Sequence, residues 1–178
     1  MRLFIAINFE EEVKDKIEDV IDEVRIYSTQ GRFTSREHMH LTLEFLGEIP
    51  INRVETIKSV MDRLKYKEFK MDIQDIGLFK RAGGDIYWIG IENNDSLLEV
   101  QYILHEGLIR EGFKLESRPY KPHITIGRKV MMKEDFSLKE LSQPIIGTGI
   151  NVGKIDLMKS EHRNGKLVHS IIHTKRLE

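Results

Sequence analysis

The stretch His40-Leu41-Thr42-Leu43 decides the fold, because it returns 83 residues later as His123-Ile124-Thr125-Ile126. In each copy a histidine and a threonine alternate with aliphatic residues, which is the period-two pattern of a strand. The histidine and the threonine therefore share one face of the strand, and the aliphatic residues face the core. One such pair is typical of the solvent-exposed face of a half-buried strand, whereas two pairs at equivalent positions of a repeat indicate a functional site.

The repeat extends outward from these strands. The same offset lays Phe4-Ile5-Ala6-Ile7 on Tyr87-Trp88-Ile89-Gly90, and residues 76–80 resemble residues 155–159. Each half is thus predicted as strand, helix, connector and His-x-Thr strand. We expect an α+β fold with bilobal pseudo-twofold duplication, mostly antiparallel sheets, helices on the outer faces and a cleft between the lobes. Residues 1–178 would form a single domain of two repeat-related lobes, approximately 1–83 and 84–178, with strands that the lobes can exchange.

Three helices are predicted where apolar residues recur every three or four positions. Asn8 and Ser96 are expected to cap the first and the third. Residues 133–143 are expected to include a short helix, and a hairpin is expected to turn at Asn164-Gly165. The apolar positions that indicate the three helices are Val13, Ile17, Val20, Ile21 and Val24; Val54, Ile57, Val60, Met61 and Leu64; and Leu97, Val100, Leu104 and Leu108.

Composition excludes several classes of protein. The chain has no cysteine, so a disulfide framework, a thiolate metal site and a cysteine nucleophile are excluded. No apolar run approaches the roughly 20 residues that span a bilayer, and no signal peptide is recognisable at the start. We therefore expect a cytoplasmic monomer that does not bind membranes. The net charge of −1 gives no overall basic field for nucleic acid, but a local basic rim is present. Its members are Lys114, Arg118, Lys121, Arg128 and Lys129.

Two imidazoles that face each other across a cleft are suited to general acid–base catalysis on a substrate between them. An unperturbed histidine pKa of about 6.5 allows one ring to be neutral and the other charged near neutral pH. The hydroxyls of Thr42 and Thr125 would bind the non-bridging oxygens of a phosphoryl group, where charge gathers in the transition state.

At these residues the chain resembles the two-histidine phosphoesterase superfamily, and within it the LigT-like RNA 2′,3′-cyclic phosphodiesterases, also called 2′-5′ RNA ligases. The segments that carry the resemblance are 2–7, His40-Leu41-Thr42-Leu43-Glu44-Phe45-Leu46-Gly47, and 118–128 with its Pro122-His123-Ile124-Thr125-Ile126-Gly127-Arg128. The resemblance implies hydrolysis of a terminal 2′,3′-cyclic phosphate on RNA, including tRNA fragments, to a 2′-phosphomonoester with no cofactor and no metal. It also implies that His40 is the proton donor and His123 the proton acceptor. One departure from the family pattern is visible near the end of the chain, where Val168 or His169 stands in place of an expected aromatic residue.

Two alternatives to hydrolysis remain open. One is the reverse reaction, a 2′-5′ RNA ligase acting on tRNA halves with an RNA 5′-hydroxyl as nucleophile, and the other is a non-catalytic RNA-end binding module. A rival chemistry is a zinc site built from His38, His40 and His123.

Phe45 and Arg128 each follow a motif histidine by five residues. An aromatic ring and a guanidinium can both stack on a base, so the two are predicted to hold the terminal nucleobase between them. Strict alternation would turn both away from the cleft and make Phe45 a core residue, unless the strands twist or bulge. Trp88 is expected in the core, and His105 is expected to be a structural helix residue.

Overall fold

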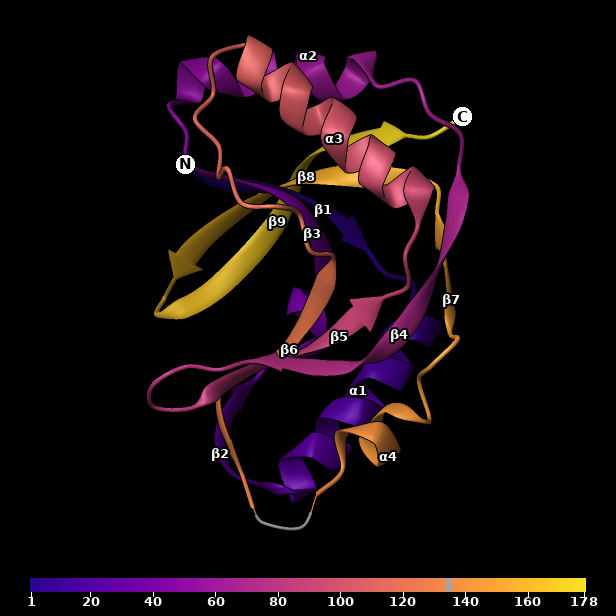
Figure 1. Ribbon diagram of the computed structural model, residues 1–178. Helices are drawn as coiled ribbons and strands as arrows, with labels where there is room; N and C mark the ends of the chain where they lie inside the picture. The colour runs from indigo at the N-terminus through magenta and orange to yellow at the C-terminus, as the bar shows by residue number, and fades with distance from the viewer. Residues whose placement is uncertain (134–135) are drawn as a thin grey trace.

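The computed structural model describes residues 1–133 and 136–178, which form two antiparallel sheets and four α-helices (Figure 1). The four-stranded sheet has the order β3 (His40–Glu48), β1 (Arg2–Asn8), β8 (Lys154–Arg163) and β9 (Lys166–Arg176). The five-stranded sheet has the order β2 (Ser28–Phe33), β6 (His123–Met132), β5 (Asp85–Ile91), β4 (Phe69–Phe79) and β7 (Gly149–Val152). The helices are α1 (Glu11–Ile26), α2 (Val54–Arg63), α3 (Asp95–Arg110) and α4 (Leu138–Ser142). The predicted α+β class with antiparallel sheets is confirmed.

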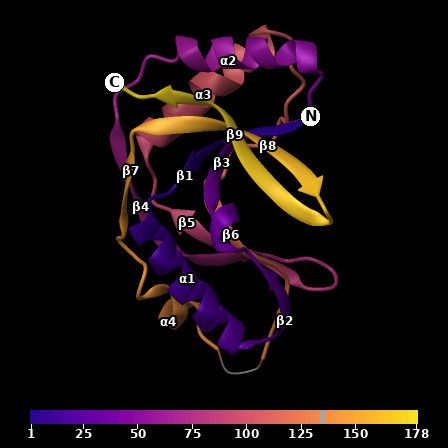
Figure 2. The same cartoon turned by 180° about the vertical axis from the view of Figure 1, so that it is seen from behind.

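Helices α1 and α3 each pack on a different sheet from the one that contains the preceding strand. Helix α1 follows β1 of the four-stranded sheet but packs on β2 and β6 of the five-stranded one. Helix α3 follows β5 and packs on β3 of the opposite sheet. In consequence α2 and α3 lie at one end of the molecule and α1 and α4 at the other (Figures 1 and 2). Every apolar position that predicted these helices is buried, as expected for stripes that face a sheet.

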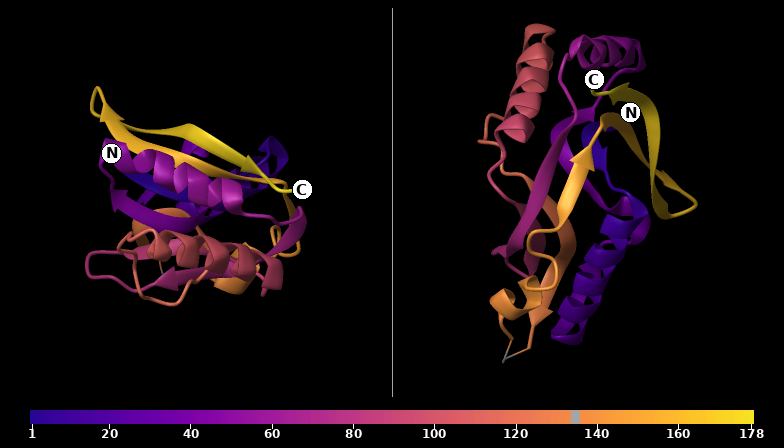
Figure 3. Two further views of the ribbon diagram at one scale, coloured as in Figure 1. Left: turned by 90° about the horizontal axis from the view of Figure 1, so that it is seen from above. Right: turned by 90° about the vertical axis from the view of Figure 1, so that its right-hand side faces the viewer.

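Strands cross between the sheets as well. Strand β4 lies in the first half of the sequence but pairs with β5 and β7, and β8 lies in the second half but pairs with β1. One continuous apolar core therefore runs through both sheets. The β8–β9 hairpin extends from the rest of the molecule toward its turn (Figures 1 and 3). Asn164 and Gly165 have φ angles of 51° and 77° at that turn, which confirms the predicted Asn-Gly hairpin.

Both motif strands carry a β-bulge at the same place. In β3, Thr42 is opposite Ala6 and Glu44 is opposite Ile5, so Leu43 is the extra residue. In β6 the pairing skips Ile126 in the same way, between Thr125 and Gly127. Both extra residues are buried, and each bulge shifts the alternation by one position. In a regular strand Phe45 and Arg128 would lie on the opposite face from the motif histidine and threonine, and the bulges place them on the same face.

The strands beside the motifs align one residue differently from the sequence repeat. His40 is opposite Asn8, whereas His123 is opposite Gly90. The offset between these neighbours is 82 rather than 83, so the alignment of residues 4–7 with 87–90 is wrong by one residue. The hydrophobic pattern alone cannot detect a shift between two apolar strands.

Two predicted caps are wrong. Glu10 precedes α1 without a side-chain cap, and Asn94 rather than Ser96 caps α3, accepting a hydrogen bond from the Leu97 amide. The Asn8 side chain instead donates to Asp156 at 2.8 Å, because Asn8 is the last residue of β1 and stays in the sheet. Within the expected helix at 133–143, α4 is present, while residues 134 and 135 lie outside the described part of the chain. No helix among the described residues is both long and apolar enough to span a bilayer.

Candidate active site

The two His-x-Thr strands lie next to each other although they belong to different sheets. The Tyr120 hydroxyl donates a hydrogen bond to the carbonyl oxygen of Thr42 at 3.0 Å, which ties the segment before β6 to β3. The Thr34 hydroxyl donates to the carbonyl oxygen of Thr125 at 2.9 Å, on the other motif strand. These bonds hold both motif strands at the edge of one cleft.

The cleft has a volume of about 690 Å³, within the usual range for small-molecule sites. Five of the six residues predicted from the sequence for the site line it: Thr42, Phe45, His123, Thr125 and Arg128. Neither threonine hydroxyl is hydrogen-bonded to another described residue, so both are free for a ligand. The sixth, His40, lies on the same face of β3 as Thr42 and packs against Phe4 and His169.

The His123 ring is oriented by the backbone carbonyl of Lys121. Its Nδ1–H donates to the carbonyl oxygen of Lys121 at 2.7 Å, which leaves Nε2 as the basic atom of the neutral ring. Burial lowers the pKa of His123, and the positive charges of Arg128 and Lys121 lower it further, against the opposing effect of that hydrogen bond. The ring is therefore neutral at pH 7 and can accept a proton.

His40 lies in a more apolar setting. Its ring centroid is 4.9 Å from that of Phe4 and 5.6 Å from that of His169. Burial and the neighbouring His169 lower the pKa of His40 to about 4, despite a hydrogen bond with the backbone of His38. His40 is thus also neutral at pH 7 until an anion comes close.

Phe45 and Arg128 are placed in the cleft by the two bulges. Phe45 is 55% exposed and its ring centroid lies 6.3 Å from that of Phe4. Arg128 is exposed on the opposite strand and close enough to lower the pKa of His123. The two side chains that we expect to hold a base therefore line the same cleft.

Sequence reasoning missed an aromatic group around His123. Trp88 is not in the core, and the prediction that it is was wrong. Its ring lies 6.2 Å from that of His123 and 5.2 Å from that of Phe79, and Lys121 Nζ lies 4.8 Å above it. The signal that could have placed Trp88 is Gly77, since a Cβ there would come within 2.2 Å of the indole. A tryptophan opposite a glycine lies flat on the sheet.

His105 connects α3 to the cleft. Its Nδ1–H donates to Glu44 Oε2 at 2.7 Å, and Gln101 Nε2 donates to the same oxygen at 3.2 Å. Glu44 is only 7% exposed, and burial raises its pKa. This group fixes α3 on β3 at one end of the cleft.

The zinc alternative is not supported by the geometry. Among the residues that the structure describes, no group of three or more histidine, aspartate or glutamate side chains is placed to hold a metal ion. His38 and His40 instead share a third neighbour, His169, which is 4.5 Å from His38 between ring centroids.

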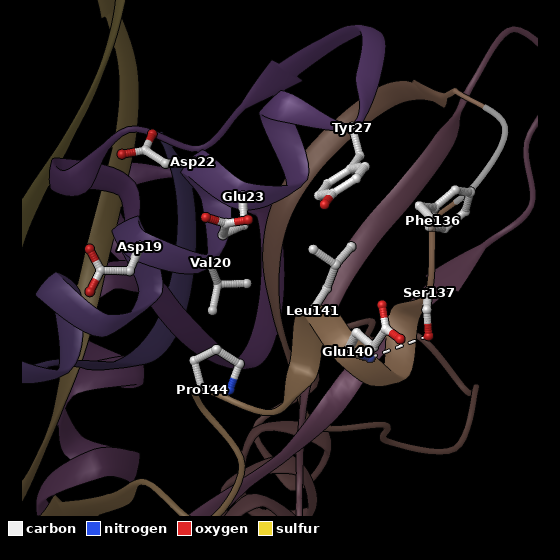
Figure 4. Close-up of a pocket in the computed structure, with 10 residues that line it drawn as sticks. All are labelled: Asp19, Val20, Asp22, Glu23, Tyr27, Phe136, Ser137, Glu140, Leu141 and Pro144. Carbon is white, nitrogen blue, oxygen red and sulfur yellow. Dashed lines mark hydrogen bonds between the residues drawn. The ribbon is translucent and has the colours of Figure 1, made fainter.

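A second hollow, of about 450 Å³, lies between α1 and α4 (Figure 4). Four carboxylates line it, those of Asp19, Asp22, Glu23 and Glu140. Acidic side chains repel phosphate, and none of the predicted site residues lines this hollow. The cleft between β3 and β6 is therefore the better candidate for a phosphate site.

The chain is similar to known proteins over most of its length. The family model of LigT-like phosphoesterases matches residues 7–87 and 89–168. A Thermotoga maritima protein named RNA 2′,3′-cyclic phosphodiesterase is 36% identical over 131 residues, which cover 72% of this chain and 70% of the relative. One from Methanothermobacter thermautotrophicus with the same name is 28% identical and covers 90% of each chain.

Solved structures share the fold. A crystal structure from Thermus thermophilus superimposes with a TM-score of 0.85 at 23% identity, covering 99% of this chain and 98% of the other. Escherichia coli LigT complexed with 3′-AMP superimposes with a TM-score of 0.82 at 24% identity, covering 99% and 97%. At these identities the likeness shows a common architecture.

Proposed function

Because this chain belongs to the family of LigT-like phosphoesterases, we propose that it hydrolyses the 2′,3′-cyclic phosphate at the end of an RNA to a 2′-phosphomonoester. The relatives named RNA 2′,3′-cyclic phosphodiesterase support the reaction class. The observation that carries the proposal is the meeting of two His-x-Thr strands from different sheets beside one cleft.

The proposed reaction uses the two histidines in opposite roles. Nε2 of His123 takes a proton from water while the water oxygen attacks phosphorus. The bond from phosphorus to the 3′ oxygen breaks, and His40 gives its proton to that oxygen. The product is a 2′-phosphate beside a free 3′-hydroxyl, and the two histidines have exchanged protonation states, which solvent then restores.

The cleft stabilises charge with groups of the chain itself. The hydroxyls of Thr42 and Thr125 bind the non-bridging oxygens, and the guanidinium of Arg128 adds positive charge. Since the cyclic phosphate is an anion, its arrival raises the pKa of the buried His40 and supplies the acid that the free protein lacks. The proposed mechanism needs no metal, so the assays below are run after exhaustive chelation.

The test separates acid from base. His40→Ala and His123→Ala should each lose about 10²–10⁴-fold in kcat on a 2′,3′-cyclic nucleotide. A second substrate carries sulfur in place of the 3′ bridging oxygen, because a thiolate leaves without being protonated. On that substrate His40→Ala should recover most of the wild-type rate, whereas His123→Ala should not.

The chain offers clean controls for this experiment. It has no cysteine, so a thiol reagent reports only the released 3′-thiol. His162, exposed in the hairpin, provides the matched variant His162→Ala, which should keep wild-type rates on both substrates. Recovery of His123→Ala instead of His40→Ala would reverse the roles, and full activity of either variant on the oxygen substrate would refute the two-histidine mechanism.

The two alternatives give different outcomes. A non-catalytic RNA-end binding module would bind the cyclic nucleotide without turnover. A 2′-5′ ligase would use the same two histidines, with an RNA 5′-hydroxyl replacing water, by microscopic reversibility. Joining of two RNA fragments at a rate above that of hydrolysis would establish ligation as the main activity.

A further inference from the structure

Three imidazoles form a cluster at β3, and the proposed reaction uses only one of them. His38 ends the short 3-10 helix at 36–38, His40 begins β3, and His169 is on β9. The ring centroid of His169 lies 4.5 Å from that of His38 and 5.6 Å from that of His40. Phe4 lies against both His40 and His169, at 4.9 Å and 5.1 Å. The His40 ring is thus packed against Phe4 and His169.

Two ring nitrogens in this cluster are buried without a partner. His38 Nδ1 is 3.0 Å from the Ser35 hydroxyl, but His38 Nε2 has no hydrogen-bond partner among the described residues. His169 Nδ1 is buried and unpartnered in the same way. Buried polar atoms without partners are uncommon, because each loses its hydrogen bond to water. Such a nitrogen is a place where a proton can be taken up.

Positive charges close to His40 and His169 oppose protonation of both rings. Burial and the positive charges of His38 and Arg2 together lower the pKa of His169 to about 4. His169 and His38 act on His40 in the same sense. The charged groups that act on these two rings come from β1, from the 3-10 helix and from β9 and are basic, whereas the carboxylate of Glu37 interacts with His38.

The carboxylates of β8, the strand between β1 and β9, are engaged elsewhere. Asp156 accepts hydrogen bonds from Asn8 at 2.8 Å and from Thr174 at 2.6 Å. Glu161 is paired with Lys159 at 2.7 Å. Neither is free to balance a second positive charge on the imidazoles.

We propose that His169 is a positioning residue for His40, holding its ring against Phe4 and competing with it for a proton. When an anionic phosphate enters the cleft, the proton resides on His40, the member nearest the reacting bond. His169 thereby sets how acidic the solution must be before the proton donor is charged. This role rests on the proposed function, in which His40 is the acid.

The test replaces His169 by residues that cannot be charged. In His169→Gln and in His169→Phe, which keeps a ring beside Phe4, the midpoint of the His40 titration should rise by up to about 1 pH unit. The midpoint is measured by NMR of the imidazole resonances in the ligand-free protein, so it does not depend on turnover. Failure of the proposed activity therefore leaves this measurement intact.

Kinetics provide the second readout. The value of kcat/KM at pH 8 should rise by up to about tenfold in both variants, since more His40 is then charged. The control is His162→Gln in the exposed part of the hairpin, where neither the titration nor kcat/KM at pH 8 should move. A lower rate at every pH with an unshifted His40 midpoint would show that His169 only packs, and would overturn the proposal.

Discussion

The proposed acid–base chemistry depends on two histidines whose charged forms are both disfavoured by burial. Burial lowers the pKa of His40 to about 4 and also lowers that of His123 from 6.5. The active form needs one ring charged and one neutral, so kcat/KM should be bell-shaped with its maximum below pH 6.5. It should fall steadily from there to pH 9, because the charged fraction declines.

The two limbs of that profile belong to the pair rather than to either residue, since neighbouring titrations are coupled. Initial rates at low substrate concentration, from pH 4 to 9, check the prediction. A rate that rises throughout from pH 5 to 9 would exclude a histidine acid.

Individual site residues were predictable to the extent that strand alternation places them. Alternation alone puts His40 with Thr42 and His123 with Thr125 on one face, and the structure places them so. It could not place Trp88, whose position depends on its cross-strand partner Gly77, because that pairing is set by the register of the β4–β5 hairpin and not by alternation within one strand.

At the level of elements, the bulges at Leu43 and Ile126 direct Phe45 and Arg128 into the cleft. Stacking of one base on such a side chain stabilises binding by about 1–3 kcal/mol. Phe45→Ala and Arg128→Ala should therefore each raise KM about 5- to 150-fold for a 2′,3′-cyclic nucleotide.

An abasic ribose 2′,3′-cyclic phosphate serves as the reference substrate. KM for that compound should be unchanged in Phe45→Ala. An equal loss on both substrates would show that Phe45 does not contact the base.

Helix α3 contacts β3 through one buried polar group in addition to its apolar stripe. In His105→Ala the buried Glu44 carboxylate loses its shortest hydrogen bond, at a cost of about 1–3 kcal/mol in the free energy of unfolding. The pKa of Glu44, already raised by burial, should rise further in this variant. A carboxyl whose folded pKa is raised loses stability as the pH increases through that pKa, so the deficit should be larger at pH 7 than at pH 4.

Urea unfolding at the two pH values measures the effect. The double variant Glu44→Gln with His105→Ala buries no charge and should be more stable at pH 7 than His105→Ala alone. If the two variants unfold alike at pH 7, burial of the unpaired Glu44 charge costs nothing measurable.

Helix existence was predictable and helix beginnings were less so. The apolar stripes of α1, α2 and α3 match their buried residues except at Leu64, which is buried but follows the last residue of α2. The caps failed because Asn8 has a tertiary partner in Asp156, which outweighs a local signal that any Asn before a helix would give.

On the scale of the whole molecule, a net charge of −1 limits how RNA is held. Basic residues at the cleft include Arg81, Arg118, Lys121 and Arg128, and Arg118 is paired with Glu116 at 2.5 Å. Two or three phosphate contacts predict a slope of about −1 to −2 in a plot of log kcat/KM against log salt concentration. Lengthening the RNA beyond a few nucleotides should leave KM nearly constant.

Substrates of increasing length with the same cyclic end, assayed between 50 and 200 mM salt, check both statements. A KM that falls progressively with RNA length would reveal a longer binding track than these four side chains provide.

The sequence repeat was enough to predict two antiparallel sheets with the motif strands in equivalent positions. Which sheet each strand joins was beyond it, since β4 and β8 have similar apolar patterns and either could complete either sheet. Side-chain packing across both sheets, not local pattern, makes that choice.

The exchange of strands between the two sheets also has a consequence for co-translational folding. Strand β1 is completed on one side by β3 and on the other by β8, which leaves the ribosome some 150 residues later. Contacts so distant in sequence are slow to form, and half a sheet with an unpaired edge is a site for aggregation. The four-stranded sheet of the nascent chain therefore stays incomplete until β8 has been synthesised. His40 and His123 come together only when both sheets are complete, so a truncated translation product would lack the proposed active site.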